Sequence, residues 1–168
     1  MAANPKIRTA GHINAELQLD QPMQDPRHEL ALNIVRTASL MTHRGSVIFR
    51  QYGLTEAQFN VLFALKYKLS AWSQSDLGKR LVVTRASITS VLDKLEEKGL
   101  VVREAVPDNR RIYHVELTDA GRQMLEEIEP LYRGEIHRIL GDLNDEQCRE
   151  LIRRLERVRQ RVATMNGD

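Results

Sequence analysis

The sequence predicts a mainly α-helical fold with a small β-wing: a winged helix-turn-helix plus a helical dimerisation region. Three observations predict it. Residues 72–121 contain, in order, a short helix, a turn, a longer helix and two strand-like runs joined by a charged hairpin. Helical patterns of apolar residues precede and follow this stretch. The last of these patterns is a narrow apolar seam of the kind that pairs with another helix.

The composition is that of an ordinary globular protein, with 42% hydrophobic and 29% charged residues. No run of about 18 apolar residues is present, so we expect no membrane span. No apolar segment near the first residues resembles a secretory signal. A single cysteine cannot form a disulfide within one chain, and we therefore expect a cytoplasmic protein. The net charge of +2 by itself gives little indication of a nucleic-acid partner.

The chain divides into three expected regions. Residues 1–26 hold three prolines and little periodicity, which predicts an N-terminal arm, partly disordered or dimer-associated, with a short helical piece near residues 12–19. Residues 27–53 and 118–168 form the expected helical dimerisation region, and residues 54–117 form the winged helix-turn-helix lobe.

The first two long helices are predicted over about residues 27–50 and from Thr55 to about Leu69. Thr55 is a good N-cap, and Gln58 lies three residues later, as a capping box requires. The residues that bracket this helix start as a hydrophobic staple are Leu54 and Phe59.

The third and fourth helices form the predicted helix-turn-helix. The third starts after Ser73, its N-cap, and ends near Leu81. The fourth is capped by Thr84 and ends at Gly99, which can adopt the left-handed conformation. Apolar residues at helical spacing predict one buried stripe of Ile88, Val91, Leu92 and Leu95.

The wing and the last two helices follow. Two strands are predicted over Leu100–Ala105 and Ile112–Leu117, with Pro107–Arg111 as a turn that places two arginines at its tip. Thr118 caps a fifth helix to about residue 140, in which Pro130 should produce a kink. Asn144 and Gln147 form a second capping box, and the apolar seam of the last helix consists of Leu151, Leu155, Val158 and Val162.

The fourth helix has the residues that entry into a major groove requires. Small polar or basic side chains near its N-terminus leave room for approach, and Arg85 can reach a guanine edge. The alternative is that Thr84 only caps the helix and that the serines are ordinary exposed surface. The candidate DNA-contacting residues before the wing are Ser73, Thr84, Arg85, Ser87, Ser90 and Lys94.

The two arginines of the wing also allow a DNA-binding and a purely structural interpretation. An arginine on a narrow hairpin fits a minor groove, whose negative potential attracts guanidinium groups, and we favour Arg110 for this role. Arg111 is its competitor or a phosphate contact, and Asp108 can brace Arg110 through a charge-assisted hydrogen bond. A solvated hairpin tip without a partner is the alternative.

Residues 54–121 resemble the multiple antibiotic resistance regulator (MarR) family of bacterial transcription factors. The matching pieces are LTEAQFNVLFAL, SQSDLGKRLVVTRASITSVLDKLEEKGLVVRE and PDNRRIYHVELTDAG. The resemblance implies a homodimer that reads a pseudo-palindrome in double-stranded DNA, and a ligand pocket where the dimerisation helices meet the DNA-binding lobe. Arg110 matches the family's wing arginine, and Asp108 matches its partner. Repression relieved by a small molecule is the implied mechanism.

Four residues are candidates for the effector pocket that the resemblance implies. They are His43, Arg44, Phe63 and Tyr67, which together can hold an aromatic carboxylate. The alternative is that these side chains are solvated or lie in a dimer interface. Redox sensing is disfavoured, because the one thiol, Cys148, occupies a hydrophobic-staple position.

Other function classes are less well supported. The sequence has no glycine-rich phosphate loop, nucleophile elbow or acid pair, and its five histidines lack metal-ligand spacing, so we expect no enzyme activity, no cofactor and no metal site. The competing hypothesis is a winged-helix architectural or protein-interaction module without ligand response.

Overall fold

The structure, a computed structural model, describes residues 12–18, 20–21, 23–67, 72–81, 85–106 and 109–165. The elements in chain order are α1 (His12–Glu16), α2 (Pro26–Gln51), α3 (Glu56–Lys66), β1 (Trp72–Ser73), α4 (Gln74–Arg80), α5 (Arg85–Glu97), β2 (Val101–Val106), β3 (Asn109–Leu117), α6 (Asp119–Ile139) and α7 (Asp145–Met165). The prediction of a mainly α-helical fold with a small β-wing is confirmed. None of the helices in the described ranges is long and apolar enough to cross a membrane.

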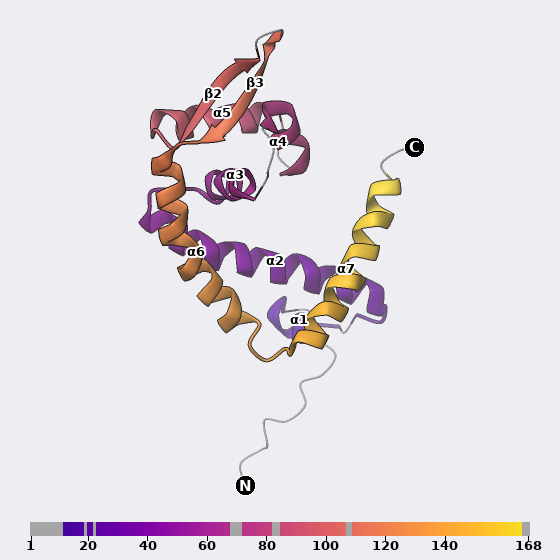
Figure 1. The fold of residues 1–168 in the computed structure, drawn as a ribbon. Coiled ribbons are helices and arrows are strands. Elements are labelled where there is room, and N and C mark those ends of the chain that lie inside the picture. Colours follow the sequence, from indigo (N-terminus) through magenta and orange to yellow (C-terminus); the bar gives the residue numbers. More distant parts are fainter. Residues whose placement is uncertain are drawn as a thin grey trace.

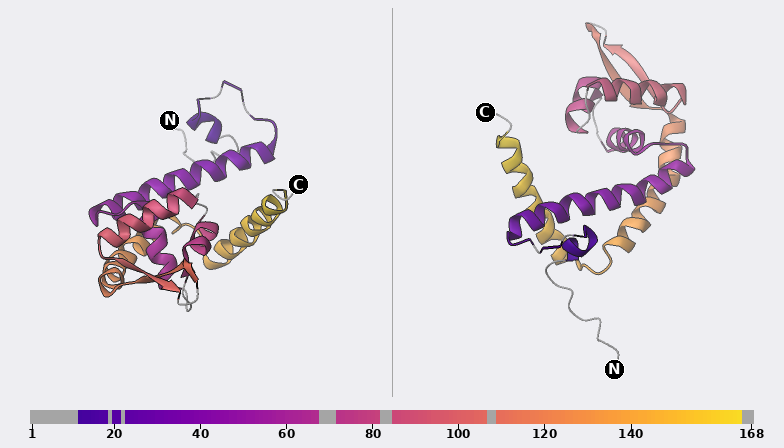
Figure 2. Two further views of the ribbon diagram at one scale, coloured as in Figure 1. Left: turned by 90° about the horizontal axis from the view of Figure 1, so that it is seen from above. Right: turned by 180° about the vertical axis from the view of Figure 1, so that it is seen from behind.

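The helix-turn-helix and the hairpin form one lobe, and the long helices lie beneath it (Figure 1). Helix α2 runs under α3, while α6 descends from the lobe and crosses α2. Helix α7 then turns back toward the level of the lobe without lying against it, as the views from above and behind show (Figure 2). The lobe therefore sits at one end of a helical support.

Local capping explains where α3 begins. The Gln58 backbone N–H donates to the Thr55 hydroxyl at 3.2 Å, and the Thr55 N–H donates to the Gln58 side chain at 2.9 Å, so the predicted capping box is confirmed. The predicted staple residues Leu54 and Phe59 are both buried. Helix α3 ends at Lys66, earlier than the predicted Leu69 (which lies outside the described residues), because Tyr67 takes the C-cap position.

The core of the lobe lies between α3, α5 and the sheet. Ile88, Leu92 and Leu95 of the predicted α5 stripe are fully buried, and Val91 is half-buried beside them. Gly99 closes α5 with a φ of +66°, the left-handed conformation that was predicted for it. The stripe therefore packs inward, and the opposite face of α5 is left exposed.

The sheet differs from the prediction in two respects. It has three strands in the order β1-β3-β2, and the additional strand β1 pairs Trp72 with Val115. In addition, β3 begins at Asn109 instead of Ile112, so the predicted turn over 107–111 is too long and its arginines belong to the strand. The reason is the pairing of Val106 with Asn109, which closes the hairpin early. The register shift beside Ala105 leaves residues 110–112 as extra residues on β3.

The C-terminal helices also start at their predicted caps. The Thr118 hydroxyl accepts from the Gly121 N–H at 3.1 Å and donates to the Gly99 carbonyl at 2.6 Å. Helix α6 continues through Pro130. Asn144 and Gln147 exchange hydrogen bonds at 2.9 and 3.0 Å, which confirms the second capping box.

Helix α7 has no buried residue along its described length. Its predicted seam residues Leu151, Val158 and Val162 are 46%, 46% and 52% exposed. At the other end of the chain, α1 packs on α2 through the buried Ile13, so part of the predicted arm is folded. Residues 1–11 lie outside the described residues.

Candidate nucleic-acid interface and adjoining cavities

The exposed face of α5 carries polar and basic residues. Ser90 and Lys94 are exposed, and both lie on the side opposite the buried stripe. Ser87 precedes Ser90 by three residues in the same helix. Arg85 is the first residue of α5, but the described structure does not include its side chain or that of Ser87. Thr84 lies outside the described residues.

Ser73 has a structural role in the helix-turn-helix. Its hydroxyl accepts from the Asp76 backbone N–H at 3.1 Å and donates to the Asp76 carboxylate at 2.7 Å. The predicted N-cap is confirmed, whereas a contact of Ser73 with DNA stays a prediction.

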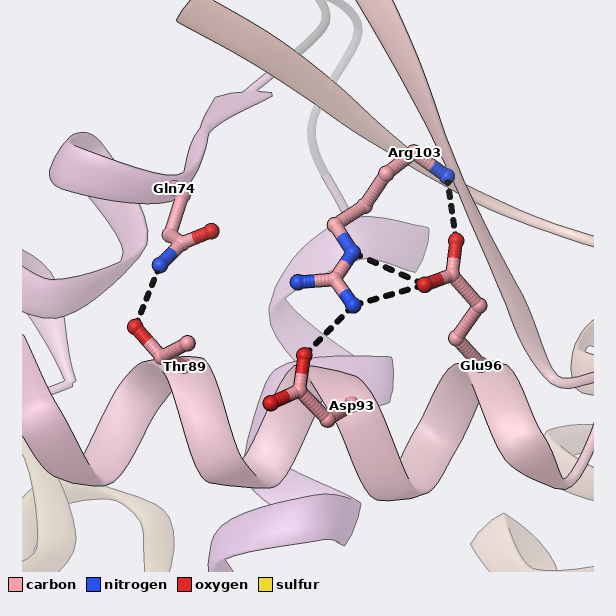
Figure 3. A network of polar contacts seen from close by, with 5 residues as sticks. All are labelled: Gln74, Thr89, Asp93, Glu96 and Arg103. Carbon is pink, nitrogen blue, oxygen red and sulfur yellow. Dashed lines mark hydrogen bonds and ion pairs between the residues drawn. The ribbon is translucent and has the colours of Figure 1, made fainter. Parts of the chain in front are cut away.

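A hydrogen bond that the sequence did not reveal joins the two helices of the motif. Gln74 at the start of α4 donates through its side-chain nitrogen to the Thr89 hydroxyl of α5 at 2.6 Å (Figure 3). Both side chains are half-buried. The contact ties the start of α4 to the middle of α5.

An arginine of β2 joins the wing to α5. The Arg103 guanidinium donates to Asp93 at 2.5 Å and to Glu96 at 2.6 and 3.0 Å, and its backbone N–H donates to the other Glu96 oxygen at 3.3 Å (Figure 3). The hydrogen bond from Arg103 lowers the pKa of Glu96, and the same bond raises the pKa of Arg103. The charge of Arg103 is thus compensated inside the molecule.

The wing arginines Arg110 and Arg111 lie in β3, next to the hairpin end. Their side chains are not among those described, and Asp108 lies outside the described residues. The brace between Asp108 and Arg110 stays a prediction.

One cavity lies between α2 and α6. It has a volume of about 290 Å³ and is lined by Arg44, Val47, Ile48, Gln51, Leu131, Glu135 and Arg138. The Arg44 guanidinium is bonded to Glu135 at 2.6 Å, and Arg138 pairs with the same carboxylate. Glu135 is only 5% exposed. The positive charges of this α2–α6 cavity thus already have a carboxylate partner.

A second cavity lies between α3 and α6. It has a volume of about 220 Å³ and is lined by Phe63, Tyr67, Glu129, Tyr132, Arg133, Ile136 and His137. The Phe63 and Tyr67 rings lie 4.7 Å apart, and burial raises the pKa of Tyr132. An adjoining hollow of about 440 Å³ shares Glu129 with it. Aromatic rings therefore form much of the wall of this α3–α6 cavity.

The carboxylate of Glu129 is the most unusual group in the α3–α6 cavity. One oxygen accepts from the Lys66 ammonium at 2.9 Å and from the Tyr67 hydroxyl at 3.2 Å. The other oxygen, Oε1, is buried and has no hydrogen-bond partner among the described residues. A buried acceptor of this kind is costly unless a donor satisfies it.

The two described cavities divide the four predicted ligand residues, whose role stays a prediction. Arg44 lines the α2–α6 cavity, Phe63 and Tyr67 line the α3–α6 cavity, and His43 lines neither of them. Sequence reasoning missed Glu129, although one signal could have found it. Glu129 follows the buried Leu125 by four residues, so a charged residue occupies a position on the apolar side of α6.

In the part of the chain that the structure describes, no group of three or more histidine, cysteine, aspartate or glutamate side chains is placed to hold a metal ion.

Comparisons with known proteins agree on one family. A sequence profile described as the MarR family matches residues 52–112. The HTH-type transcriptional regulator MhqR of Bacillus subtilis is 33% identical over 108 residues, which cover 62% of this chain and 74% of that protein. The HTH-type transcriptional repressor YetL of the same organism is 30% identical over 136 residues, covering 80% of this chain and 81% of that one.

A solved structure of Bordetella bronchiseptica BpsR superimposes with a TM-score of 0.68 at 26% identity, and covers 80% of this chain and 93% of that one. It was described with a mechanism by which 6-hydroxynicotinic acid regulates DNA binding by BpsR.

Proposed function

The chain belongs to the MarR family of transcriptional regulators, and we propose that it is a homodimeric repressor that binds an inverted-repeat operator and is released by a small aromatic ligand. The observation that carries this proposal is the exposed polar face of α5, which stands beside a hairpin bearing two arginines. This arrangement allows α5 to enter a major groove while the hairpin enters the adjacent minor groove.

The proposed DNA contacts come from two elements. The hydroxyls of Thr84, Ser87 and Ser90, with Arg85 and Lys94, meet the major groove and the phosphates, and Ser73 lies at the start of the preceding helix. Arg110 enters the minor groove, braced by Asp108, and Arg111 contacts a phosphate.

The proposed dimer uses α7. Three of its four seam residues are about half exposed, and none is buried within the chain. A regular apolar seam gains stability when a second helix covers it. Two lobes held about one DNA turn apart, roughly 34 Å, would then dock on two half-sites. The regions assigned to this role are residues 27–53 and 118–168.

The proposed effector site is the α3–α6 cavity. Its ring-lined wall suits a flat aromatic molecule, and the unpartnered Oε1 of Glu129 supports a ligand that carries a hydrogen-bond donor. Arg133 and His137 on the same wall are available to an acidic substituent. The cavity joins α3 of the lobe to α6, so a ligand there can favour one lobe position over another. Of the other two predicted ligand residues, Arg44 lines the α2–α6 cavity and His43 lines neither cavity.

Selection of bound sequences from a random DNA duplex library tests the proposal. We expect the selected sequences to share an inverted repeat, and footprinting to show protection over about one to two DNA turns. The affinity for this site should fall at least tenfold in Arg110→Ala, because the charged contact of the wing with DNA is lost. Arg149→Ala, which removes an exposed arginine of α7, is the control. Broad protection without sequence preference would favour the architectural alternative and refute operator recognition.

A further inference from the structure

One side chain of the wing forms hydrogen bonds to helix α5, beside the apolar core that α5 and the sheet share. Arg103 of β2 reaches two carboxylates, Asp93 and Glu96, which lie three residues apart on α5. The Arg103 side chain is 19% exposed, whereas the side chains of Asp93 and Glu96 are 50% and 40% exposed, so the guanidinium is mostly covered and the carboxylates face solvent. We call these three residues the α5–β2 clamp.

The geometry of the clamp requires an arginine. Two guanidinium nitrogens donate to the same Glu96 oxygen, and one of them also donates to Asp93 (Figure 3). The backbone N–H of Arg103 donates to the second Glu96 oxygen, so the strand itself is tied to the helix. The planar fork of an arginine fits such a set, whereas a lysine ammonium reaches it only as a point charge.

The clamp stands at the base of the wing. Arg103 pairs with Val115 of β3, and β2 continues only to Val106. Three further residues at a rise of about 3.3 Å place the strand end roughly 10 Å beyond the clamp. A rotation of the hairpin about its base would therefore displace Arg110 and Arg111 relative to α5.

We propose that Arg103 is a positioning residue that fixes the wing relative to α5, so that the two elements meet DNA as one rigid unit. This inference rests on the proposed function, because it assumes that the wing contacts DNA. Without the clamp, binding must first order the hairpin, and that ordering reduces the affinity.

A double-mutant cycle tests the inference on the duplex of highest affinity from the random library. Arg103→Met should weaken binding about tenfold when the wing is intact, and less than about twofold when Arg110 and Arg111 are both alanine, because coupled residues are non-additive. Arg103→Lys should fall between Arg103→Met and the parent protein. Equal losses in both backgrounds would overturn the inference.

Two controls separate positioning from other effects. Asp93→Asn with Glu96→Gln breaks the same clamp but removes the carboxylates that Arg103→Met would leave free to repel phosphates. This variant should therefore also weaken binding when the wing is intact and by less than about twofold when Arg110 and Arg111 are both alanine, and adding Arg103→Met to it should have little further effect. Arg122→Met removes an arginine in the first turn of α6 that is bonded to the Leu117 carbonyl and Asp119, outside the clamp. It should leave operator affinity within about twofold of the parent, as expected for a site without a shared partner.

The cycle also distinguishes failure of this inference from failure of the proposed function. If the double alanine variant of Arg110 and Arg111 binds as well as the parent, the wing contact itself is wrong. If that variant binds weakly but Arg103→Met adds its full effect, only the positioning role is wrong. Amide hydrogen exchange should rise along β2 and β3 in Arg103→Met and remain at the parent level in Arg122→Met.

Discussion

Lys66, the last residue of α3, donates a 2.9 Å hydrogen bond to Glu129 of α6, a carboxylate that is only 9% exposed. The contact links the DNA-binding lobe to the long helix beneath it. Tyr67 donates to the same oxygen. The junction between lobe and support therefore contains a buried negative charge whose partners both come from the end of one short helix.

Lys66→Met should destabilise the protein by about 2 kcal/mol, because it leaves Glu129 charged, buried and short of a partner. Urea denaturation measures the loss. Adding Glu129→Gln should recover most of it, since the uncompensated charge is then gone. A double variant as unstable as Lys66→Met would show that the ion pair does not determine this stability.

Two glycines of α6 differ in the space that surrounds them. A Cβ at Gly121 would overlap the backbone carbonyl oxygen of Leu100, whereas a Cβ at Gly134 would meet nothing within 4 Å. Gly121→Ala should cost about 3 kcal/mol through overpacking, and Gly134→Ala should gain up to about 1 kcal/mol from helix propensity. Urea denaturation of both variants checks this, and equal effects would contradict it.

Substitutions on two opposite faces of α7 should differ in their effect on the proposed dimer. Leu155→Glu places a charge in the seam and should shift the protein from dimer to monomer in sedimentation at micromolar concentration. Gln160→Glu adds the same charge on the far face and should leave the dimer intact. A dimer that survives Leu155→Glu would move the interface away from α7.

The clamp predicts an unusual titration. Its hydrogen bond from Arg103 lowers the folded-state pKa of Glu96 below the ordinary value of 4.5. A lowered pKa means that the contact stabilises the fold above pH 4.5 and that this contribution is lost as the pH falls through the folded-state pKa. Carboxyl-carbon NMR should detect the low titration, and Arg103→Met should return Glu96 to its ordinary range. An unchanged titration in Arg103→Met would contradict the stated cause.

The sequence was sufficient for features that are encoded locally. Thr55, Ser73, Thr118 and Asn144 all cap the helices predicted for them, because a cap depends only on the next two or three residues. The α5 stripe was predictable for the same reason, since helical periodicity indicates which face is buried.

Contacts between distant residues were not predictable in this way. Lys66 and Glu129 are 63 residues apart, and Arg44 and Glu135 are 91 apart, so no local pattern pairs them. In the sequence Arg103 is one basic residue among several in the lobe, and only the packing of β2 on α5 reveals that its charge is compensated. The early start of β3 likewise depends on cross-strand pairing of Val106 with Asn109.

The exposure of α7 has a consequence for how the protein behaves at low abundance. A helix of this length gains little stability from its own hydrogen bonds in water, and α7 buries none of its residues within the chain. In the proposed dimer, the free energy that keeps α7 ordered comes from association with the second chain, so the thermal midpoint should rise with total protein concentration. In a cell with few copies, mass action would then set the fraction of intact regulator, and small changes in expression would alter operator occupancy more than proportionally.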